Sequence, residues 1–419
     1  LVLAILKKFP NPVLTRQMLA GGQVDPVARR LVVQWVAETG QKGLRDHVAA
    51  VLSDSDITAE LFHTTLAALD MLDGGDPKKI DNTPPAALAV PLLKDSDRPA
   101  SVRSLALQMV DPSDKALDQP LFEALLASNT PRLVAETVRT LGLSKRPFAA
   151  ELLLKTAADV MKPIAVRADA IAGLGRNTQV PAVAGALRRF AGGGELAIRV
   201  EAVRSLRPTL KADTSSQATF TELVASVTKT ENPTRADRLW ADQLATSLTL
   251  AGRPVPDALQ ALAGNRPKGI DALANAVKQG GSVPAGRRLF FHASGPQCGR
   301  CHVVNGRGRR VGPDLSLIAR SRNRRQLLES ILDPSREVAP QFTSWTLVTT
   351  DGRVLNGVIV YENRDRLTIE GADGKQTNLA NTDVEFRTPQ KKSLMPDKLV
   401  HQVTLEGLRD LLAYLESLK

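Results

Sequence analysis

Cysteine, histidine and aromatic residues are all scarce in this sequence. Among 419 residues there are two cysteines and five histidines, and aromatic residues make up 4% of the chain. The two cysteines are three positions apart, which excludes a framework of structural disulfides and leaves one isolated pair to explain. The low aromatic content, together with abundant alanine and leucine, favours helices and argues against an all-β architecture.

A long apolar run and an N-terminal signal peptide are also missing. No apolar stretch approaches the roughly 18 residues that a membrane-spanning helix needs, so we predict no membrane span. The chain begins at Leu1, and Leu1–Phe9 has the pattern of a helix, so we expect a processed form or a fragment of a longer polypeptide. The length predicts two or three domains.

Positive charge is in clear excess, with a net charge of +11 and a pI near 9.8. A basic surface suits nucleic acid, a membrane face or an acidic protein partner, and charge alone does not choose among these. The sequence has no nucleic-acid recognition motif, and its basic residues are not interleaved with aromatic ones. We therefore predict that the chain does not bind nucleic acid.

One pattern recurs through the first two-thirds of the chain. An anchor residue is followed by apolar residues four and seven positions later, and the anchors are 33, 41, 31, 33 and 32 residues apart. The long step contains the polar stretch Gly74–Pro85, which we interpret as a loop insertion. A period near 32 with this spacing is typical of a solenoid of helical hairpins that share a continuous core. The anchors and their apolar partners are Arg29 (Val33, Val36), Phe62 (Leu66, Leu69), Arg103 (Leu107, Val110), Val134 (Val138, Leu141), Arg167 (Ile171, Leu174) and Arg199 (Val203, Leu206).

Two of these repeats resemble HEAT repeats. They contain Ala165-Val-Arg167 and Ala197-Ile-Arg199, each with an alanine three residues after the arginine. The resemblance covers about residues 10–250 and implies an α-solenoid. The repeat residues either only pack the array or also provide a docking surface for another protein. We assign residues 1–280 to this array.

The two cysteines belong to Cys298-Gly-Arg-Cys301-His302, the C-x-x-C-H pattern of covalent haem attachment. Two thiols add across the two vinyl groups of haem, and the two intervening residues set the separation of the sulfur atoms. The next residue then directs its imidazole at the iron. We predict one haem c attached through Cys298 and Cys301, with Nε2 of His302 as the proximal ligand and Nδ1–H bonded to a carbonyl.

Two other readings of the cysteine pair fit the sequence less well. A thioredoxin-like dithiol needs a βαβ context, and the flanking residues do not show one. A structural zinc site needs four ligands, and the chain has no second pair of cysteines.

The surroundings of the motif resemble a small mono-haem cytochrome c. Pro284–Phe290 precedes it as a helix start, Gly312–Ser316 follows it as a tight loop, and Leu405–Leu418 has the pattern of an amphipathic last helix. In that family the first and last helices cross through a small residue and aromatic residues. The loop proline packs on the proximal histidine, and a neighbouring carbonyl accepts the ring N–H of that histidine. The resemblance gives these roles to Gly286, Phe290, Tyr414 and Pro313.

The sixth iron ligand is predicted in the loop Ser393-Leu-Met395-Pro396, just before the last helix. The soft thioether of Met395 favours ferrous iron and raises the reduction potential. The metal ligands are then His302 and Met395. His292 and His401 are the rival ligands and would give a lower potential. The other methionines, Met18, Met71, Met109 and Met161, lie in the repeat array and have the pattern of core residues.

An insertion accounts for the long separation between His302 and Met395. Residues 342–388 alternate as strands at Thr343–Thr349, Val354–Tyr361, Arg366–Ile369 and Thr377–Leu379, and Asp-Gly pairs at 351–352 and 373–374 indicate hairpin turns. We expect a small antiparallel sheet or barrel inside a cytochrome c domain that spans residues 281–419. Its role is either that of a spacer or haem cover, or that of a docking module. The predicted fold class is therefore mainly α, a HEAT-like solenoid followed by a mono-haem cytochrome c domain with a β insertion.

The combined segments resemble the haem-binding domain of planctomycete and verrucomicrobial (PVC-type) proteins. The resemblance covers about residues 283–419. Members often follow HEAT-like repeats and an amino-terminal β-propeller similar to sugar dehydrogenases; this sequence contains no propeller, which puts any intrinsic dehydrogenase activity in doubt. The segments that carry the resemblance are Gly286–Phe290, Cys298–His302, Gly312–Ser316, Leu327–Ser335, Leu347–Gly352 and the Met395–Pro396 loop.

Arginine is concentrated around the motif. Between Ala285 and Arg325 there are ten arginines, and the only acid is Asp314. Arginines such as Arg309 and Arg310 can pair with haem propionates, and a ring of them would steer an acidic partner. The alternative is an ordinary solvated basic surface.

These features predict electron transfer rather than stand-alone catalysis. We expect the haem to relay electrons from a dehydrogenase module or partner to an acidic redox acceptor. Because haem is attached outside the cytoplasm in the families that this chain resembles, we expect a periplasmic or otherwise exported protein. The alternative is a haem enzyme or gas-binding sensor with an open sixth position, in which the repeats act as a protein-interaction scaffold.

Overall fold

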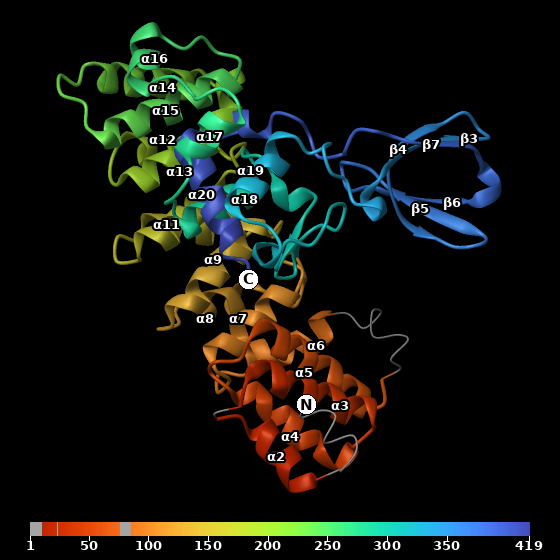
Figure 1. Ribbon diagram of the computed structural model, residues 1–419. Coiled ribbons are helices and arrows are strands. Elements are labelled where there is room, and N and C mark those ends of the chain that lie inside the picture. Colours follow the sequence, from red (N-terminus) through yellow and green to blue (C-terminus); the bar gives the residue numbers. More distant parts are fainter. Residues whose placement is uncertain (1–10, 23, 76–84) are drawn as a thin grey trace. The chain divides into compact units, whose positions relative to one another are not determined.

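A computed structural model describes residues 11–22, 24–75 and 85–419 of the chain (Figure 1). The predicted helix at Leu1–Phe9 lies outside these residues, as do residues 76–84 of the predicted loop insertion. The described chain is mainly helical and carries one five-stranded antiparallel sheet towards its C-terminus, which confirms the coarse fold class. Two compact units, Leu1–Leu152 and Leu153–Lys419, divide the chain. The boundary predicted after residue 280 lies inside the second unit and stays a prediction.

Helices of the repeats pack in two alternating series. Within the first unit α3, α5, α7 and α9 contact one another in turn, and α6 and α8 pack against α7 and α9. Within the second unit α11, α13 and α15 form one row and α12, α14 and α16 form the other. The bounds are α2 (Pro12–Ala20), α3 (Pro26–Glu38), α4 (Arg45–Ala50), α5 (Ala59–Leu72), α6 (Pro85–Lys94), α7 (Ala100–Met109), α8 (Gln119–Leu126), α9 (Pro131–Leu143), α10 (Ala149–Ala158), α11 (Ile164–Leu174), α12 (Pro181–Gly192), α13 (Leu196–Leu206), α14 (Thr214–Thr228), α15 (Arg235–Leu250) and α16 (Asp257–Ala263).

The six sequence anchors occupy one structural position. Each is the fourth residue of an odd-numbered helix, from Arg29 in α3 to Arg199 in α13. Its amide N–H makes the first α-helical hydrogen bond, to the carbonyl of the N-cap residue. The apolar residues four and seven positions later then fall on one face of the helix. All twelve are buried except Leu69, which is half-buried.

Three of the four methionines predicted to be core residues are buried or half-buried. Met18 is buried, and Met71 and Met109 are half-buried. The prediction was wrong for Met161, which is 87% exposed because it lies in the turn between α10 and α11.

Three anchor arginines share a second role. The Nε–H groups of Arg29, Arg103 and Arg167 each donate, at 3.0 Å, to a carbonyl oxygen ten residues earlier. Each acceptor is the second-last residue of the preceding helix, whose carbonyl has no partner within its own helix. A positive side chain at a helix C-terminus also complements the helix dipole. The repeated arginine therefore joins the two helices of one hairpin.

Four further helices of the second unit surround the cysteine motif. They are α17 (Ile270–Ala276), α18 (Val283–Phe291), α19 (Arg324–Leu332) and α20 (Leu405–Glu416), so both helices predicted to flank the motif are present. α18 and α20 cross closely, because Gly286 has no side chain: a Cβ there would lie 2.0 Å from the carbonyl oxygen of Asp410. The rings of Phe290 and Tyr414 pack edge to face at 5.6 Å beside this crossing.

The inserted sheet has the strand order β6-β5-β4-β3-β7 and an apolar core of its own. The four predicted strands are confirmed as β3 (Ser344–Thr349), β4 (Val354–Glu362), β5 (Arg366–Glu370) and β6 (Gln376–Ala380), and β7 (Val384–Pro389) adds a fifth. β7 was not predicted, although Val384 and Phe386 alternate with Glu385 and Arg387; most of its side chains are exposed.

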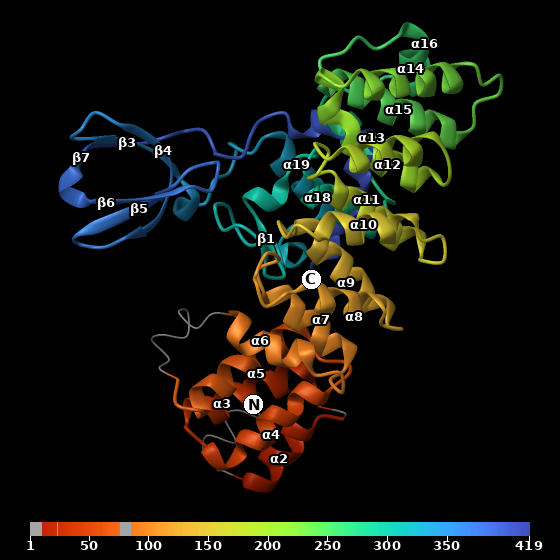
Figure 2. The same ribbon diagram turned by 180° about the vertical axis from the view of Figure 1, so that it is seen from behind.

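The sheet is strongly curled. Its edge strands β6 and β7 are consecutive in the chain and are joined by the 3-10 turn Asn381–Asp383. In a flat sheet, four strand spacings would separate these edges by about 19 Å, whereas the four Cα–Cα steps from Ala380 to Val384 span at most about 14 Å. In both ribbon views β3, β4 and β7 lie on one side of the curled sheet and β5 and β6 on the other (Figures 1 and 2).

Candidate functional site

The segment Cys298–His302, called here the cysteine motif, forms one tight turn. Cys298–Arg300 is a 3-10 turn that follows Gln297, whose φ of 55° lies in the left-handed region. The amides of Cys301 and His302 both donate to the carbonyl of Cys298, at 3.1 and 2.9 Å. A single turn of hydrogen-bonded backbone therefore fixes the spacing of both thiols and the imidazole.

His302 is oriented by a hydrogen bond at one ring nitrogen. Its Nδ1 lies 2.9 Å from the carbonyl oxygen of Pro313. Because a carbonyl can only accept, the ring hydrogen is on Nδ1, and Nε2 carries the lone pair that a metal ligand needs. Burial lowers the pKa of His302, and the bond to Pro313 partly opposes this effect, so the ring is neutral at pH 7. The predicted acceptor near Pro313 is thus the carbonyl of that residue itself.

Three glycines leave room for this arrangement. A Cβ on Gly312 would lie 2.8 Å from Cε1 of His302, so the loop backbone packs directly against the imidazole. A Cβ on Gly308 would lie 2.1 Å from the His302 carbonyl oxygen, and one on Gly299 would lie 2.6 Å from the ring of Phe291. Two backbone bonds hold the loop there, from Gly312 N–H to Cys301 O at 2.7 Å and from Leu315 N–H to Val303 O at 2.9 Å.

Met395 and Cys298 pack against the same apolar cluster, which includes residues of α18, α19 and α20. Met395 is half-buried, and Ser393 Oγ accepts its amide N–H at 3.1 Å. The amide of Ser393 donates in turn to Ser335 Oγ at 3.2 Å, which ties the methionine loop to the chain after α19. The core beneath the cysteine motif therefore also supports the predicted distal loop.

The cysteine thiols are free and have little thiolate character. Burial raises the pKa of Cys298 to about 12, and burial also raises the pKa of Cys301. A catalytic dithiol has the opposite property, a lowered pKa. Among the described residues no group of three or more His, Cys, Asp and Glu side chains could hold a metal ion, so nothing there supports a zinc site of protein ligands.

The two rival histidines differ in their surroundings. His292 is buried, and hydrogen bonds occupy both of its ring nitrogens, from the Ser294 amide at 3.0 Å and with Ser205 Oγ at 3.2 Å. His401 lies exposed in the 3-10 turn Leu399–Gln402. His292 thus has no free nitrogen to offer to a metal in this arrangement.

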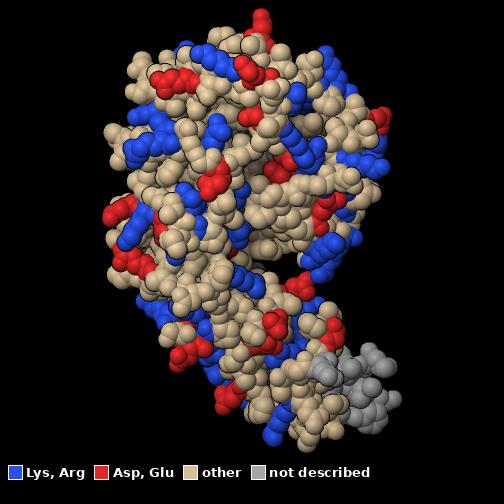
Figure 3. Space-filling model, turned by 90° about the vertical axis from the view of Figure 1, so that its left-hand side faces the viewer, with Lys and Arg blue, Asp and Glu red and all other residues tan. Residues whose placement is uncertain are grey.

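In the folded chain, carboxylates from outside the arginine-rich segment offset part of its positive charge. Arg309 and Arg310 are exposed, and Nη1 of Arg309 donates to the carbonyl of Asp373 at 3.0 Å. On the face shown in Figure 3, Lys and Arg side chains are mixed with Asp and Glu rather than gathered in one patch. At least four of the ten arginines pair with carboxylates from outside residues 285–325, namely Arg288 with Asp169 and Glu201, Arg322 with Glu337, Arg324 with Glu416, and Arg325 with Asp271 and Glu329.

The inserted sheet reaches the neighbourhood of the cysteine motif through its β5–β6 turn. Besides the bond from Arg309 to Asp373, the turn packs closely on this arginine, because a Cβ on Gly374 would lie 1.9 Å from its Nη1. Glu370 at the end of β5 acts electrostatically on the Cys301 thiol. The β5–β6 turn is therefore part of the wall around the motif.

Sequence reasoning missed two features of this region. The first is a short hairpin directly after the motif, β1 (Val303–Val304) and β2 (Arg307–Gly308), whose Asn305-Gly306 turn has both φ angles positive. The Asn-Gly pair is a hairpin signal that could have revealed it. The second is the buried role of Arg288, which no local pattern indicates because its partners are 87 and 119 residues away.

Within the described part of the chain, no helix combines the length and the apolar character needed to cross a membrane. Neither the models of known protein families nor the sequences of curated proteins match this chain.

Proposed function

We propose that this chain is a mono-haem c-type electron-transfer protein, with haem bound covalently by Cys298 and Cys301 and with His302 and Met395 as axial ligands. A haem held in this way supplies one-electron exchange between ferric and ferrous iron. The finer fold assignment belongs to the same proposal: HEAT-like repeats followed by a cytochrome c domain with an inserted β subdomain. The six equivalent anchors and the α18–α20 crossing at Gly286 support it.

One observation carries the proposal, the bond between Nδ1 of His302 and the Pro313 carbonyl. It leaves Nε2 unprotonated on a residue whose two neighbouring thiols are set by the same turn. Gly312 lets the backbone pack on the ring, so the orientation is fixed from two sides. An oriented neutral histidine beside two thiols is the donor set that covalent haem attachment needs.

Two further observations support Met395 as the distal ligand. Its loop is anchored by Ser393 and Ser335, and its side chain packs against the cluster that Cys298 also contacts. The buried rival His292 uses both ring nitrogens in hydrogen bonds. A His/Met pair raises the reduction potential and leaves no open position for a small ligand, which fits electron transfer better than ligand binding.

The charge around the cysteine motif suggests which kind of redox acceptor would bind. The exposed arginines Arg300, Arg309 and Arg310 flank the motif and would favour an acidic acceptor, with association that weakens as salt is added. The donor is proposed to be a dehydrogenase module or partner, and the location the periplasm or another exported compartment.

The test is the visible and near-infrared spectrum of the protein produced in cells that attach haem covalently. We expect a haem that stays bound after denaturation, and a weak near-infrared band of methionine-ligated ferric iron. Cys298→Ser with Cys301→Ser should abolish covalent attachment. Met395→Ala should remove the near-infrared band and keep the haem.

Met71→Ala is the matched control for the distal ligand, because Met71 is also half-buried but lies in α5. It should leave the band unchanged. If wild-type protein lacks the band and its reduced form binds carbon monoxide readily, the sixth position is open, and the enzyme or sensor alternative replaces electron transfer. A protein without covalent haem contradicts the whole proposal.

A further inference from the structure

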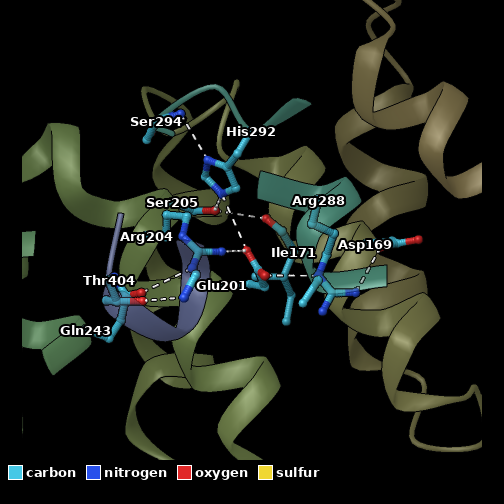
Figure 4. A network of polar contacts seen from close by, with 12 residues as sticks. Asp169, Ile171, Glu201, Arg204, Ser205, Gln243, Arg288, His292, Ser294 and Thr404 are labelled. Atoms are coloured by element: carbon cyan, nitrogen blue, oxygen red, sulfur yellow. Dashed lines mark hydrogen bonds and ion pairs between the residues drawn. The ribbon is translucent and has the colours of Figure 1, made fainter. Parts of the chain in front are cut away.

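Helix α18, which precedes the cysteine motif, is docked on the repeat helices by buried charges (Figure 4). Arg288 is 8% exposed and donates to Glu201 of α13 at 2.9 Å and to Asp169 of α11 at 3.2 Å. Glu201 also binds Arg204, at 2.7 Å, and Arg204 contacts Gln243 of α15 at 3.2 Å. The two cations and two carboxylates balance, so the network stays compatible with burial.

The two carboxylates occupy equivalent places in successive repeats. Asp169 and Glu201 are each the sixth residue of their helices and are 32 residues apart, which is the period of the array. Adjacent repeats therefore present two acids on the same side, and one guanidinium of α18 bridges them. The contact therefore joins acids at an equivalent position of two repeats to one arginine, Arg288, of the segment that carries the cysteine motif.

A directional chain of hydrogen bonds runs beside the ion network. The Ser294 amide donates to Nδ1 of His292, at 3.0 Å, so Nδ1 carries no hydrogen. Nε2–H of the neutral ring then donates to Ser205 Oγ of α13 at 3.2 Å, and the Ser205 hydroxyl donates to the Ile171 carbonyl of α11 at 3.1 Å. Nε2 of His292 also lies 3.8 Å from Oε2 of Glu201, beyond hydrogen-bond distance, so the bonds to Ser205 and from the Ser294 amide define the ring orientation and tautomer.

The same short segment touches the cysteine motif. The carbonyl of Phe291 accepts from Nη2 of Arg176 at 3.2 Å, and the Phe291 ring packs on Gly299 between the two cysteines. His292 is six residues before Cys298. The turn after α11 thus holds Phe291 by its backbone, α13 holds His292 by its side chain, and the ring of Phe291 contacts the motif.

We propose that Ser205 is a positioning residue for the cysteine motif: through His292 it fixes the segment that enters the motif, and the repeat helices are thereby part of the haem site. The effect on haem rests on the proposed function, whereas the mechanical link from Ser205 to residues 292–301 does not. Ser205 touches neither haem nor its ligands, so its influence is indirect.

The test compares Ser205→Ala with Ser104→Ala in the full chain. Both serines are fully buried, but Ser104 donates to Ala100 within its own helix α7. In Ser205→Ala the lost hydrogen bond should make the Ser294 amide exchange with deuterium about 5- to 30-fold faster. The near-infrared methionine band should weaken and the reduction potential should shift. Ser104→Ala should change none of these readouts.

His292→Gln is the conservative variant, because its side-chain amide can still donate to Ser205. It should keep slow exchange at residues 297–302, whereas His292→Asn, which is too short to reach Ser205, should not. A structural role alone would lower the unfolding midpoint of Ser205→Ala and leave the Ser294 exchange, the band and the potential as in wild type; that result overturns the proposal. Faster exchange with an unchanged band and potential also overturns it.

The failure of this inference is distinguishable from failure of the proposed function. If the wild-type chain carries no covalent haem, the proposed function is wrong. Deuterium exchange still tests whether Ser205 positions residues 292–301. Unchanged exchange in Ser205→Ala then refutes the link, and faster exchange confirms it without haem.

Discussion

Buried and half-buried arginines are used differently in the helical repeats and in the segment that carries the cysteine motif. In the repeats, three of them bind a carbonyl ten residues earlier, namely Arg29, Arg103 and Arg167. In the motif segment, Arg288 binds acids 87 and 119 residues away, and Arg324 binds groups 47 and 92 residues away. The first use stabilises one hairpin at a time, and the second holds separate parts of the unit together.

The same contrast exists between two equivalent repeat helices. Glu136 in α9 and Glu201 in α13 are both buried sixth residues, and each pairs with an arginine three residues later. The nitrogen–oxygen distance is 3.8 Å for Glu136 and 2.7 Å for Glu201. Glu201 additionally binds Arg288 of α18. A repeat position can therefore become a docking point when a distant segment supplies the counter-charge.

The largest effect is expected from removing the shared cation. Arg288→Ala leaves the carboxylates of Glu201 and Asp169 buried without it, which should cost about 3–5 kcal/mol of unfolding free energy. Arg45→Ala, which breaks the exposed ion pair with Asp73, should cost much less, because exposed ion pairs contribute little to stability. Urea unfolding followed by circular dichroism measures both. Equal costs would show that α18 docking does not depend on the network.

Alanine substitutions at two glycines, one at the α18–α20 crossing and one in a repeat helix, should have opposite effects on stability. Gly286→Ala forces a Cβ into the Asp410 carbonyl and should cost about 1–3 kcal/mol. Gly185→Ala in α12 meets only the ends of arginine side chains at 3.8 Å and should stabilise the chain by about 0.5–1 kcal/mol. Thermal unfolding of the two variants should move in opposite directions. A shift in the same direction would contradict the close α18–α20 contact.

Asp410 makes the crossing sensitive to pH. Burial raises the pKa of Asp410 to about 6, from an ordinary value of 3.8. Between these values the folded state holds a proton that the unfolded state has lost, so this contribution favours folding at low pH and declines as pH rises through 6. Asp410→Asn keeps an acceptor for the Ser282 amide, which Asp410 Oδ1 binds at 2.7 Å.

The difference in unfolding free energy between Asp410→Asn and wild type should therefore grow by of order 2 kcal/mol from pH 4 to pH 7. Urea unfolding across this range measures it. A difference that stays constant with pH would mean that Asp410 titrates normally in the folded chain.

The smallest effect concerns the local arginines. Arg103→Ala removes the bond to the Leu93 carbonyl at the end of α6 and should cost about 1–2 kcal/mol. Arg16→Ala, at an exposed position of α2, should change stability by less than about 0.5 kcal/mol. Both are read from urea midpoints. An Arg103→Ala cost as large as that of Arg288→Ala would remove the distinction between local and long-range arginines.

The sequence was informative wherever a structure depends on neighbours in the chain. The repeat anchors, both helices that flank the motif, and four strands of the inserted sheet all follow from periods of 3.6 or 2 residues and from Asp-Gly turns. Strand β7 was missed: its alternation of Val384 and Phe386 with charged residues is short, and most of its side chains are exposed. Of the candidate site, the turn of Cys298–His302 and the half-buried Met395 loop agree with the spacing, while their roles as haem ligands stay predictions.

By itself the sequence determined the local elements, because helix phase, turn chemistry and the C-x-x-C-H spacing act over a few residues. The tertiary structure decided which carbonyl orients His302, which carboxylates neutralise the arginines, and which serine holds His292. Those choices join residues as far as 119 positions apart. A buried charge or ring nitrogen must find its partner in space, and no period along the chain records where that partner lies.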